Sequence, residues 1–212
     1  MASAIARVRV WDRGEERVRS FSAADCGFGY RTSRFKQELG RFVVLEVTFQ
    51  FPLGNLSQPI TYTELARTLG IEVGERAPMT AVREAVLVLR RSKGMVLDPE
   101  DHDTWSAGSF FTNPVAPADQ IPEGAPAWAQ PDGLVKTSAA WLIERAGFTK
   151  GYRRDGVGIS GKHALALTNR GYGTTAELIA LASEIRSGVH DRFGIQLDAE
   201  PTLVGCHLSA QT

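Results

Sequence analysis

The chain of 212 residues has no excess charge of either sign, because 24 lysines and arginines stand against 24 aspartates and glutamates. It carries no net field that would attract nucleic acid or an anionic membrane, and we expect neither as a partner. It also lacks an apolar run near the roughly 20 residues that span a bilayer. Residues 1–10 lack the apolar stretch and cleavage site of a signal peptide. We therefore expect a cytoplasmic protein.

Cysteine is scarce as well. Cys26 and Cys206 lie far apart, and neither belongs to a CxxC or Cys/His pattern, so we expect two reduced thiols in the protein interior. The four histidines show no ligand spacing, and no metal site is expected. The sequence contains no GxxxxGK[ST], which excludes a P-loop, and no GxSxG nucleophile elbow, and we expect no Rossmann dinucleotide-binding motif.

The composition that remains, 43% hydrophobic and 23% charged, is typical of a globular protein. Period-two patterns predict a hairpin of residues 5–11 with 17–21 and a long, central strand at 42–51. They also predict a strand at 164–167 and a strand-rich C-terminal end at 195–200 and 202–204. Helical patterns cover residues 63–69, 80–93, 134–146 and 175–193, with Thr63, Thr80 and Thr174 or Thr175 as caps. The predicted class is α+β.

Two further features concern organisation. A hairpin alone is only marginally stable, so the strands at 5–11 and 17–21 either pair with 42–51 or lack an upstream partner. Residues 95–130 carry few periodic apolar positions and many Pro, Gly and Asp. An irregular stretch of that length in a compact domain is usually functional or crosses between domains.

Three short segments could carry chemistry. Residues 27–36 place Arg31 and two more cations on a backbone loosened by glycines, which suits an oxyanion clamp or a solvated basic loop. Residues 106–114 expose Ser109 between small residues while two phenylalanines anchor the loop, so Ser109 is a proton donor or an ordinary turn serine. Residues 198–201 end in Glu200 and a proline, and the Glu200 carboxylate is either an acid that acts in catalysis or a surface cap.

In their order and spacing, these segments resemble the UDP-N-acetylenolpyruvoylglucosamine reductases (UDP-N-acetylmuramate dehydrogenases) of peptidoglycan synthesis. The matching pieces are 29–36 (GYRTSRFK), 92–93 (SK), 107–114 (AGSFFTNP), 139–144 (AAWLIE), 150–151 (KG), 163–169 (HALALTN) and 197–201 (LDAEP). Each piece is weak alone, but the match covers nearly the whole chain. The joint pattern favours the functional alternative for all three segments.

The resemblance implies a chemistry. In that family FAD is reduced by NADPH, and a hydride then passes to the enolpyruvyl group of UDP-N-acetylglucosamine enolpyruvate, giving UDP-N-acetylmuramate. By resemblance, Ser109 protonates the enol intermediate, and Arg31 and Glu200 stabilise it. This assignment is physically consistent, because hydride addition creates an enolate whose charge needs a cation and a hydrogen-bonding acid before a proton reaches carbon.

The resemblance also implies binding residues. Tyr62, Lys93, Asn113 and His163 are expected to hold the UDP-sugar, with Tyr62 on a loop that closes over it. Cofactor contacts are expected at Tyr30, Arg90 and Gly108, and the enzyme is expected to be a monomer.

The departures from the family pattern concern the flavin. The Gly-rich stretch that holds most of it in the family is absent, so residues 1–93 are expected to be a remnant of the FAD-binding domain to which 195–212 return. Residues 94–194 are expected to form the substrate-binding C-terminal domain. The alternative function is a non-catalytic UDP-sugar-binding fragment that has lost the flavin domain. An Asp/His-rich insert at 98–104 is expected to be a mobile surface loop.

Overall fold

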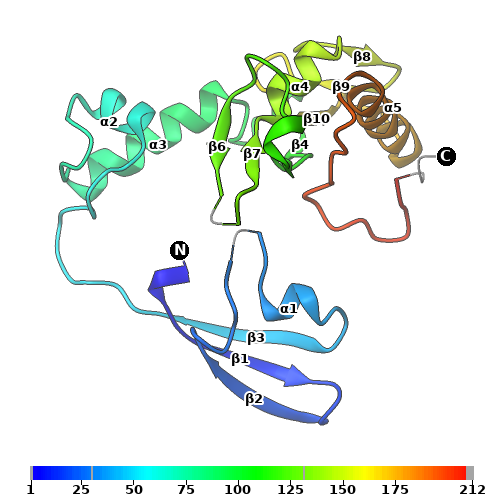
Figure 1. Cartoon of the computed structure of the whole chain (residues 1–212). Coiled ribbons are helices and arrows are strands. Elements are labelled where there is room, and N and C mark those ends of the chain that lie inside the picture. The colour runs from blue at the N-terminus through cyan, green and yellow to red at the C-terminus, as the bar shows by residue number, and fades with distance from the viewer. Residues whose placement is uncertain (1, 30, 131, 209–212) are drawn as a thin grey trace. The chain divides into compact units, whose positions relative to one another are not determined.

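The computed structural model describes residues 2–29, 31–130 and 132–208 (Figure 1). Helices and strands are mixed along the chain, which confirms the α+β class. The chain divides into two compact units, a first unit of residues 1–56 and a second unit of residues 57–212. No helix in the described ranges is long and apolar enough to cross a membrane.

The first unit is built on a three-stranded antiparallel sheet in the order β2-β1-β3, following a short 3-10 turn η1 (Ala2–Ala4). β1 (Ile5–Asp12) and β2 (Arg17–Ser22) form the predicted hairpin, which is confirmed. β3 (Phe42–Phe49) pairs with β1 on its other side, so the first of the two pairing alternatives holds. The prediction that 42–51 is the central strand is wrong. The central strand is β1, whose Val8 and Val10 are buried, whereas much of β3 is exposed.

The core of the first unit is small and largely aromatic. Val8, Val10, Phe21 and Cys26 are buried, and the short helix α1 (Arg34–Gln37) brings further apolar contacts to them. Phe21 meets two further phenylalanine rings edge to face, at centroid distances of 5.5 and 6.0 Å. Cys26 is fully buried, as predicted, and burial raises the pKa of its thiol. Cys206, in the second unit, is only half-buried, so the prediction of an interior thiol is wrong there.

The second unit combines four helices with two small antiparallel sheets. The helices are α2 (Thr63–Leu69), α3 (Met79–Ser92), α4 (Ala139–Arg145) and α5 (Thr175–Phe193). One sheet has the order β4-β10-β9-β8, made of Ser106–Ser109, Ala166–Asn169, Val157–Ile159 and Arg153–Arg154. The other has the order β5-β7-β6, made of Val115–Ala116, Val135–Thr137 and Ala127–Ala129. Two 3-10 turns, η2 (His102–Thr104) and η3 (Ala118–Gln120), lie in the irregular stretch.

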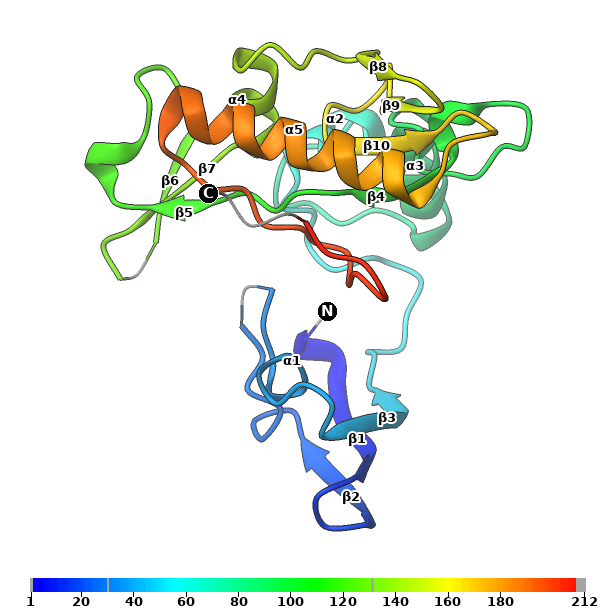
Figure 2. The same ribbon diagram turned by 90° about the vertical axis from the view of Figure 1, so that its right-hand side faces the viewer.

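α5 organises the core of the second unit. Leu181, Ala182, Ile185 and Val189 have no exposed surface, and they pack with α4 and the β10–β9 strands beside the helix (Figure 2). Thr174 caps the helix in a complete capping box with its third residue. The predicted helix and its cap are confirmed.

Several predicted boundaries are wrong. The helix predicted over 134–146 begins only at α4, because Ser138 caps it through the Trp141 N–H and 135–137 pair as β7. Thr63 and Thr80 lie inside α2 and α3, whose N-caps are Tyr62 and Pro78. The strand predicted at 164–167 is shifted to β10.

The prediction of strands at the C-terminal end is also wrong. Residues 195–204, all within the described part of the chain, run without a strand and make one isolated bridge between Ala199 and Phe111. Ile195 and Leu197 alternate because they are buried in the core, not because they join a sheet.

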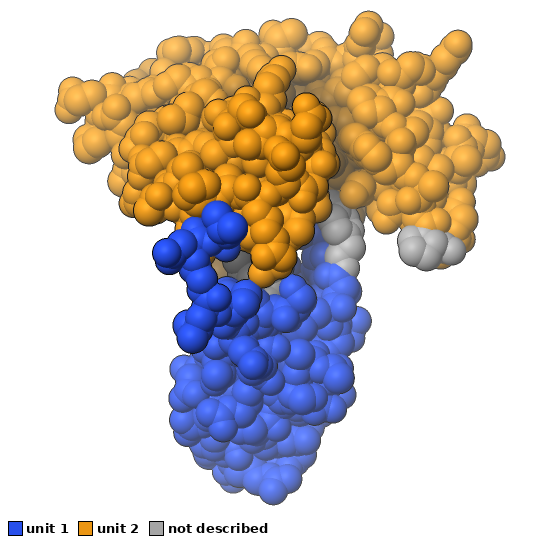
Figure 3. Space-filling model, turned by 90° about the vertical axis from the view of Figure 1, so that its left-hand side faces the viewer, with its two compact units in different colours: residues 1–56 blue, residues 57–212 orange. Residues whose placement is uncertain are grey.

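The division into compact units falls at residues 56 and 57 (Figure 3). It reflects where backbone contacts are dense. A functional border between a flavin domain and a substrate domain at 93 and 94, with 195–212 returning to the former, stays a prediction.

Candidate active site

Ser109 and Glu200 are brought together in the second unit by backbone pairing. Ser109 ends β4, and the next residue, Phe110, accepts a hydrogen bond on its carbonyl oxygen from the Glu200 N–H at 2.8 Å. Phe111 and Ala199 then form the isolated bridge. The two residues predicted for proton donation and enolate stabilisation therefore lie on neighbouring segments.

The serine loop, residues 106–114, is anchored in the core by its two phenylalanines. Phe110 and Phe111 are 5% and 1% exposed, and their rings meet at a centroid distance of 5.0 Å within the main core. The Phe110 N–H also donates to the Leu165 carbonyl at 2.7 Å. Ser109 itself is half-buried. The predicted anchoring of this loop in the core is confirmed.

His163 lies in the loop that leads into β10, next to the serine strand. Its Nδ1 accepts a hydrogen bond from the Leu165 N–H at 3.2 Å, so the neutral ring carries its proton on Nε2. Burial lowers the pKa of His163, and the fields of Lys93 and Lys150 lower it further. His163 is therefore neutral at pH 7 and presents a donor beside two cations.

Lys93 and Tyr62 line one cavity of about 410 Å³ between α2 and the end of α3. Lys93 Nζ pairs with Glu64 Oε2 at 2.6 Å, and this bond lowers the pKa of Glu64. Tyr62 is 75% exposed at the start of α2. The pair ties the two helices together and holds Lys93 at the rim of the cavity.

Arg90 and Gly108, the two described residues predicted to contact the cofactor, line a second cavity of about 430 Å³. Arg90 lines both cavities, so the two adjoin at the end of α3. Gly108 has a φ of +83°, a backbone conformation that favours glycine. Within residues 2–29, 31–130 and 132–208, no group of three or more His, Cys, Asp or Glu side chains could hold a metal ion.

Asn113 lies at the start of α4. Its Oδ1 accepts from the Ala139 N–H at 3.0 Å and so satisfies one of the first amides of that helix. A contact between Asn113 and a substrate could use the amide nitrogen or the remaining lone pair of Oδ1.

Arg31 lies in the first unit at a tight turn. Gly29 and Thr32 exchange backbone hydrogen bonds of 3.1 and 3.4 Å across the turn, and Arg31 adopts a φ of +56°. A non-glycine residue in this region costs on the order of 1 kcal/mol and is enriched at functional sites. Its exposed guanidinium is compatible with the predicted role, while Tyr30 lies outside the described residues.

Residues 98–204 match the family model described as UDP-N-acetylenolpyruvoylglucosamine reductase, C-terminal domain. The chain belongs to this reductase family. It is 58% identical over 205 residues to the UDP-N-acetylenolpyruvoylglucosamine reductase of Cutibacterium acnes, covering 95% of this chain and 54% of that protein. To the Thermobifida fusca protein of the same name it is 55% identical over 221 residues, covering 98% of this chain and 62% of the relative.

A solved structure has the same fold. The UDP-N-acetylenolpyruvylglucosamine reductase of Thermus caldophilus aligns with a TM-score of 0.51 at 21% identity, over 94% of this chain and 52% of that one. The chain spans little more than half the length of the relatives it matches.

In this member of the reductase family, the insert at 98–104 is anchored, which corrects the expectation of a mobile loop. Thr104 is buried and its hydroxyl oxygen lies within hydrogen-bonding distance of the backbone carbonyls of Asp98 and Asp101, at 2.9 and 2.8 Å. Asp103 pairs with Arg170 at 2.6 Å. Asp101 and Asp103 are thus used for contacts within the second unit, whereas Asp98 and Glu100 stay exposed.

Sequence reasoning missed three side chains near the site, namely Glu64, Lys150 and Asp103. Glu64 and Asp103 could not be found, because each acts through a partner far along the chain. Lys150 carried a signal, since it belongs to the short matching piece at 150–151.

Proposed function

We propose that this chain is the substrate-binding and proton-donating portion of a UDP-N-acetylenolpyruvoylglucosamine reductase of peptidoglycan synthesis. The observation that carries the proposal is the hydrogen bond from the Glu200 N–H to the Phe110 carbonyl, which lays the segment of Glu200 against the segment of the half-buried Ser109. The substrate is UDP-N-acetylglucosamine enolpyruvate, and FAD and NADPH are the cofactors. When bound, the flavin would supply the hydride.

The residues of this chain account for the charge and the proton. Ser109 delivers a proton to the substrate carbon, and its fixed backbone limits the directions from which the proton can arrive. Glu200, with Arg31 from the first unit, stabilises the enolate as it forms. These roles need a hydroxyl held near a carboxylate, and the backbone pairing between the segments of Ser109 and Glu200 supports that proposal.

The cations beside the two cavities suit a diphosphate. Lys93 and Arg90 line these cavities and supply positive charge. The charges of Lys93 and Lys150 also act on His163, which supplies a neutral Nε2–H donor. Volumes of about 410 and 430 Å³ fall within the range of small-molecule pockets. Tyr62 at the exposed rim can stack over a bound ligand.

The flavin fits this chain only in part. Arg90 and the open backbone of Gly108, beyond which an added Cβ would meet no atom, can hold one portion of it. The chain spans little more than half of its relatives, so we propose that further flavin contacts come from the remaining portion of a full-length enzyme.

The test is Ser109→Ala, assayed as NADPH oxidation that depends on the enolpyruvyl sugar in the presence of FAD. We expect turnover to fall by about 100-fold or more, the usual cost of losing a general acid. Affinity for UDP-N-acetylglucosamine, measured by calorimetry, should stay within about twofold if Ser109 acts only in the transition state. The control is Ser187→Ala, which changes an exposed serine on α5 outside the proposed site. An unchanged rate in Ser109→Ala would rule out the assigned role.

The second candidate is a non-catalytic UDP-sugar-binding protein, which the cavities lined by Lys93 and Arg90 support. It predicts calorimetric binding of UDP-N-acetylglucosamine without turnover in the unaltered chain. Binding with turnover selects the reductase, and the absence of binding contradicts both candidates.

A further inference from the structure

The acidic insert connects three segments that carry predicted site residues, and Asp103 is its centre. Both of its carboxylate oxygens are used: Oδ1 pairs with Arg170 at 2.6 Å, and Oδ2 accepts from the Gly161 N–H at 3.1 Å. The side chains of Asp103 and Arg170 are only 18% and 16% exposed. A charge pair at this depth is screened less by solvent than a surface pair.

The two partners of Asp103 bracket the loop and strand that hold His163. Gly161 precedes His163 by two residues, and Arg170 directly follows β10. β10 pairs with β4, in which Ser109 lies opposite Ala166. One carboxylate therefore ties both ends of the segment that carries His163 and supports the serine strand.

The third segment is the end of α3. Gly94 directly follows Lys93 and is buried, and a Cβ at Gly94 would come within 2.8 Å of the Asp103 carbonyl oxygen. The backbone of the insert thus packs closely against the residue that follows Lys93.

We propose that Asp103 is a positioning residue for the UDP-sugar site, holding His163 and Lys93 in the arrangement that binds the diphosphate. This inference rests on the proposed function. Asp103 acts through Gly161 and Arg170, and needs no contact with substrate. Arg170 makes the dependence stronger, because its Nε is buried with no hydrogen-bond partner among the described residues. The carboxylate of Asp103 supplies the charge that this guanidinium needs.

The neighbouring pair of Asp101 with Lys162 is a weaker device. Its side chains are 31% and 40% exposed, and exposed pairs contribute little to stability. We therefore assign the positioning to Asp103 and not to the acidic insert as a whole.

The test uses the whole chain with Asp103→Asn, Arg170→Gln and the double variant, and Glu100→Gln as a matched control that removes an exposed acid of the same insert. Asparagine keeps the size and one acceptor oxygen, so Asp103→Asn should fold, as checked by circular dichroism. We expect calorimetric affinity for UDP-N-acetylglucosamine to fall about tenfold in each single variant. The affinity of the double variant should be no lower than that of either single variant, because both substitutions break the same Asp103–Arg170 pair. Glu100→Gln should bind like the unaltered chain.

Nitrogen NMR of the histidine side chains supplies an arm that does not depend on the ligand, with His163 assigned by His163→Gln. In Asp103→Asn the Nδ1 and Nε2 shifts of His163 should move, whereas Glu100→Gln should leave them in place. Lower thermal stability with unchanged His163 shifts and unchanged affinity would overturn the proposal. If the unaltered chain shows no affinity for UDP-N-acetylglucosamine, the proposed function fails, and the His163 shifts still decide whether Asp103 positions that loop.

Discussion

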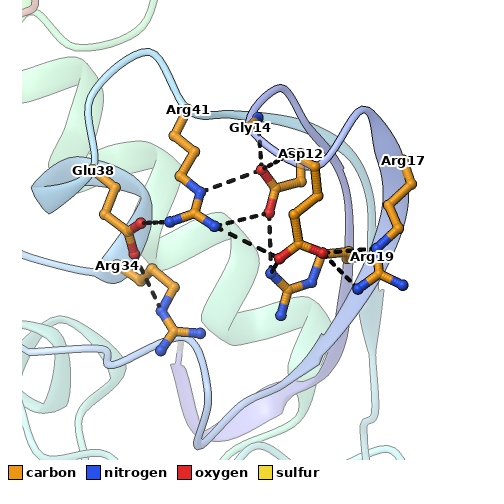
Figure 4. Close-up of polar contacts among 8 residues, drawn as sticks. Asp12, Gly14, Arg17, Arg19, Arg34, Glu38 and Arg41 are labelled. Atoms are coloured by element: carbon orange, nitrogen blue, oxygen red, sulfur yellow. Dashed lines mark hydrogen bonds and ion pairs between the residues drawn. The ribbon is translucent and has the colours of Figure 1, made fainter.

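Asp12, at the end of β1, shows what a single carboxylate can organise in the first unit. Its side chain is fully buried and accepts from Arg41 at 3.2 and 3.3 Å and from Arg19 at 3.0 Å (Figure 4). The backbone N–H groups of Gly14 and Glu15 also donate to it, at 3.0 and 3.3 Å. These bonds, that of Arg41 first, lower the pKa of Asp12 to about 2. The hairpin turn is thereby closed around a charged group.

The lowered pKa of Asp12 predicts a pH dependence of stability. A carboxyl group whose pKa is about 2 in the folded state and has its ordinary value of 3.8 in the unfolded chain stabilises the fold above pH 4, and this contribution is lost as the pH falls towards 2. We expect Asp12→Asn to lower the urea midpoint of the first unit at pH 7, followed by the amide NMR signals of β1. The difference from the unaltered chain should shrink between pH 4 and 2.

Glu16→Gln, an exposed change in the same turn, is the control and should show no such convergence. A difference between Asp12→Asn and the unaltered chain that is constant with pH would contradict the assigned cause.

At the scale of elements, the junction after α3 predicts a specific cost for a methyl group. Gly94 has a φ of +68°, and a Cβ there would meet the Asp103 carbonyl oxygen at 2.8 Å. Gly70, at the end of α2, has nearly the same φ of +69° but would meet no atom within 4 Å. Gly70→Ala therefore measures backbone strain alone, whereas Gly94→Ala adds a backbone clash.

We expect Gly70→Ala to lower the free energy of unfolding by about 1 kcal/mol. Gly94→Ala should lower it by at least about 2 kcal/mol, because the neighbouring backbone has to move. Urea unfolding of the two variants gives the comparison. An equal loss of unfolding free energy in the two variants would show that the backbone at Asp103 moves aside without an energetic cost.

Elements with local signals were predictable from the sequence. α5 combines a capping box at Thr174, a regular apolar stripe and a glycine stop, so every signal for it lies within its own residues. The segment after it could not be predicted. Ile195 and Leu197 alternate as in a strand, but they are buried in the core of the second unit. The one isolated bridge between this segment and the serine loop, among the described residues, is made by Ala199.

The site follows the same division. The anchoring of the serine loop was predictable, because two successive phenylalanines, Phe110 and Phe111, beside a turn of small residues indicate burial in a core. The pairing of Lys93 with Glu64 and the link of Asp103 to Gly161 were not, since each joins residues that no local pattern connects. The field of Lys93 on His163 likewise depends on tertiary structure.

At the scale of the whole molecule, the two units have separate cores of unequal size. The core of the first unit has four buried residues, Val8, Val10, Phe21 and Cys26, whereas that of the second has a cluster of 15 around α5. A unit of about 60 residues buries a smaller fraction of its surface than one of about 150 residues. The first unit is therefore expected to be the less stable of the two.

This inequality predicts two unfolding transitions in urea. In a Cys206→Ser chain, Cys26 is the remaining thiol and is buried in the first unit, so its labelling reports the opening of that unit. Circular dichroism at 222 nm reports mainly the second unit, which contains α3 and α5. Labelling should rise at lower urea than the helix signal is lost. Leu181→Ala, which removes about 2–5 kcal/mol of packing, should lower the helix midpoint and leave the Cys26 midpoint in place. Coincident transitions that move together in Leu181→Ala would mean that the chain folds as one cooperative unit.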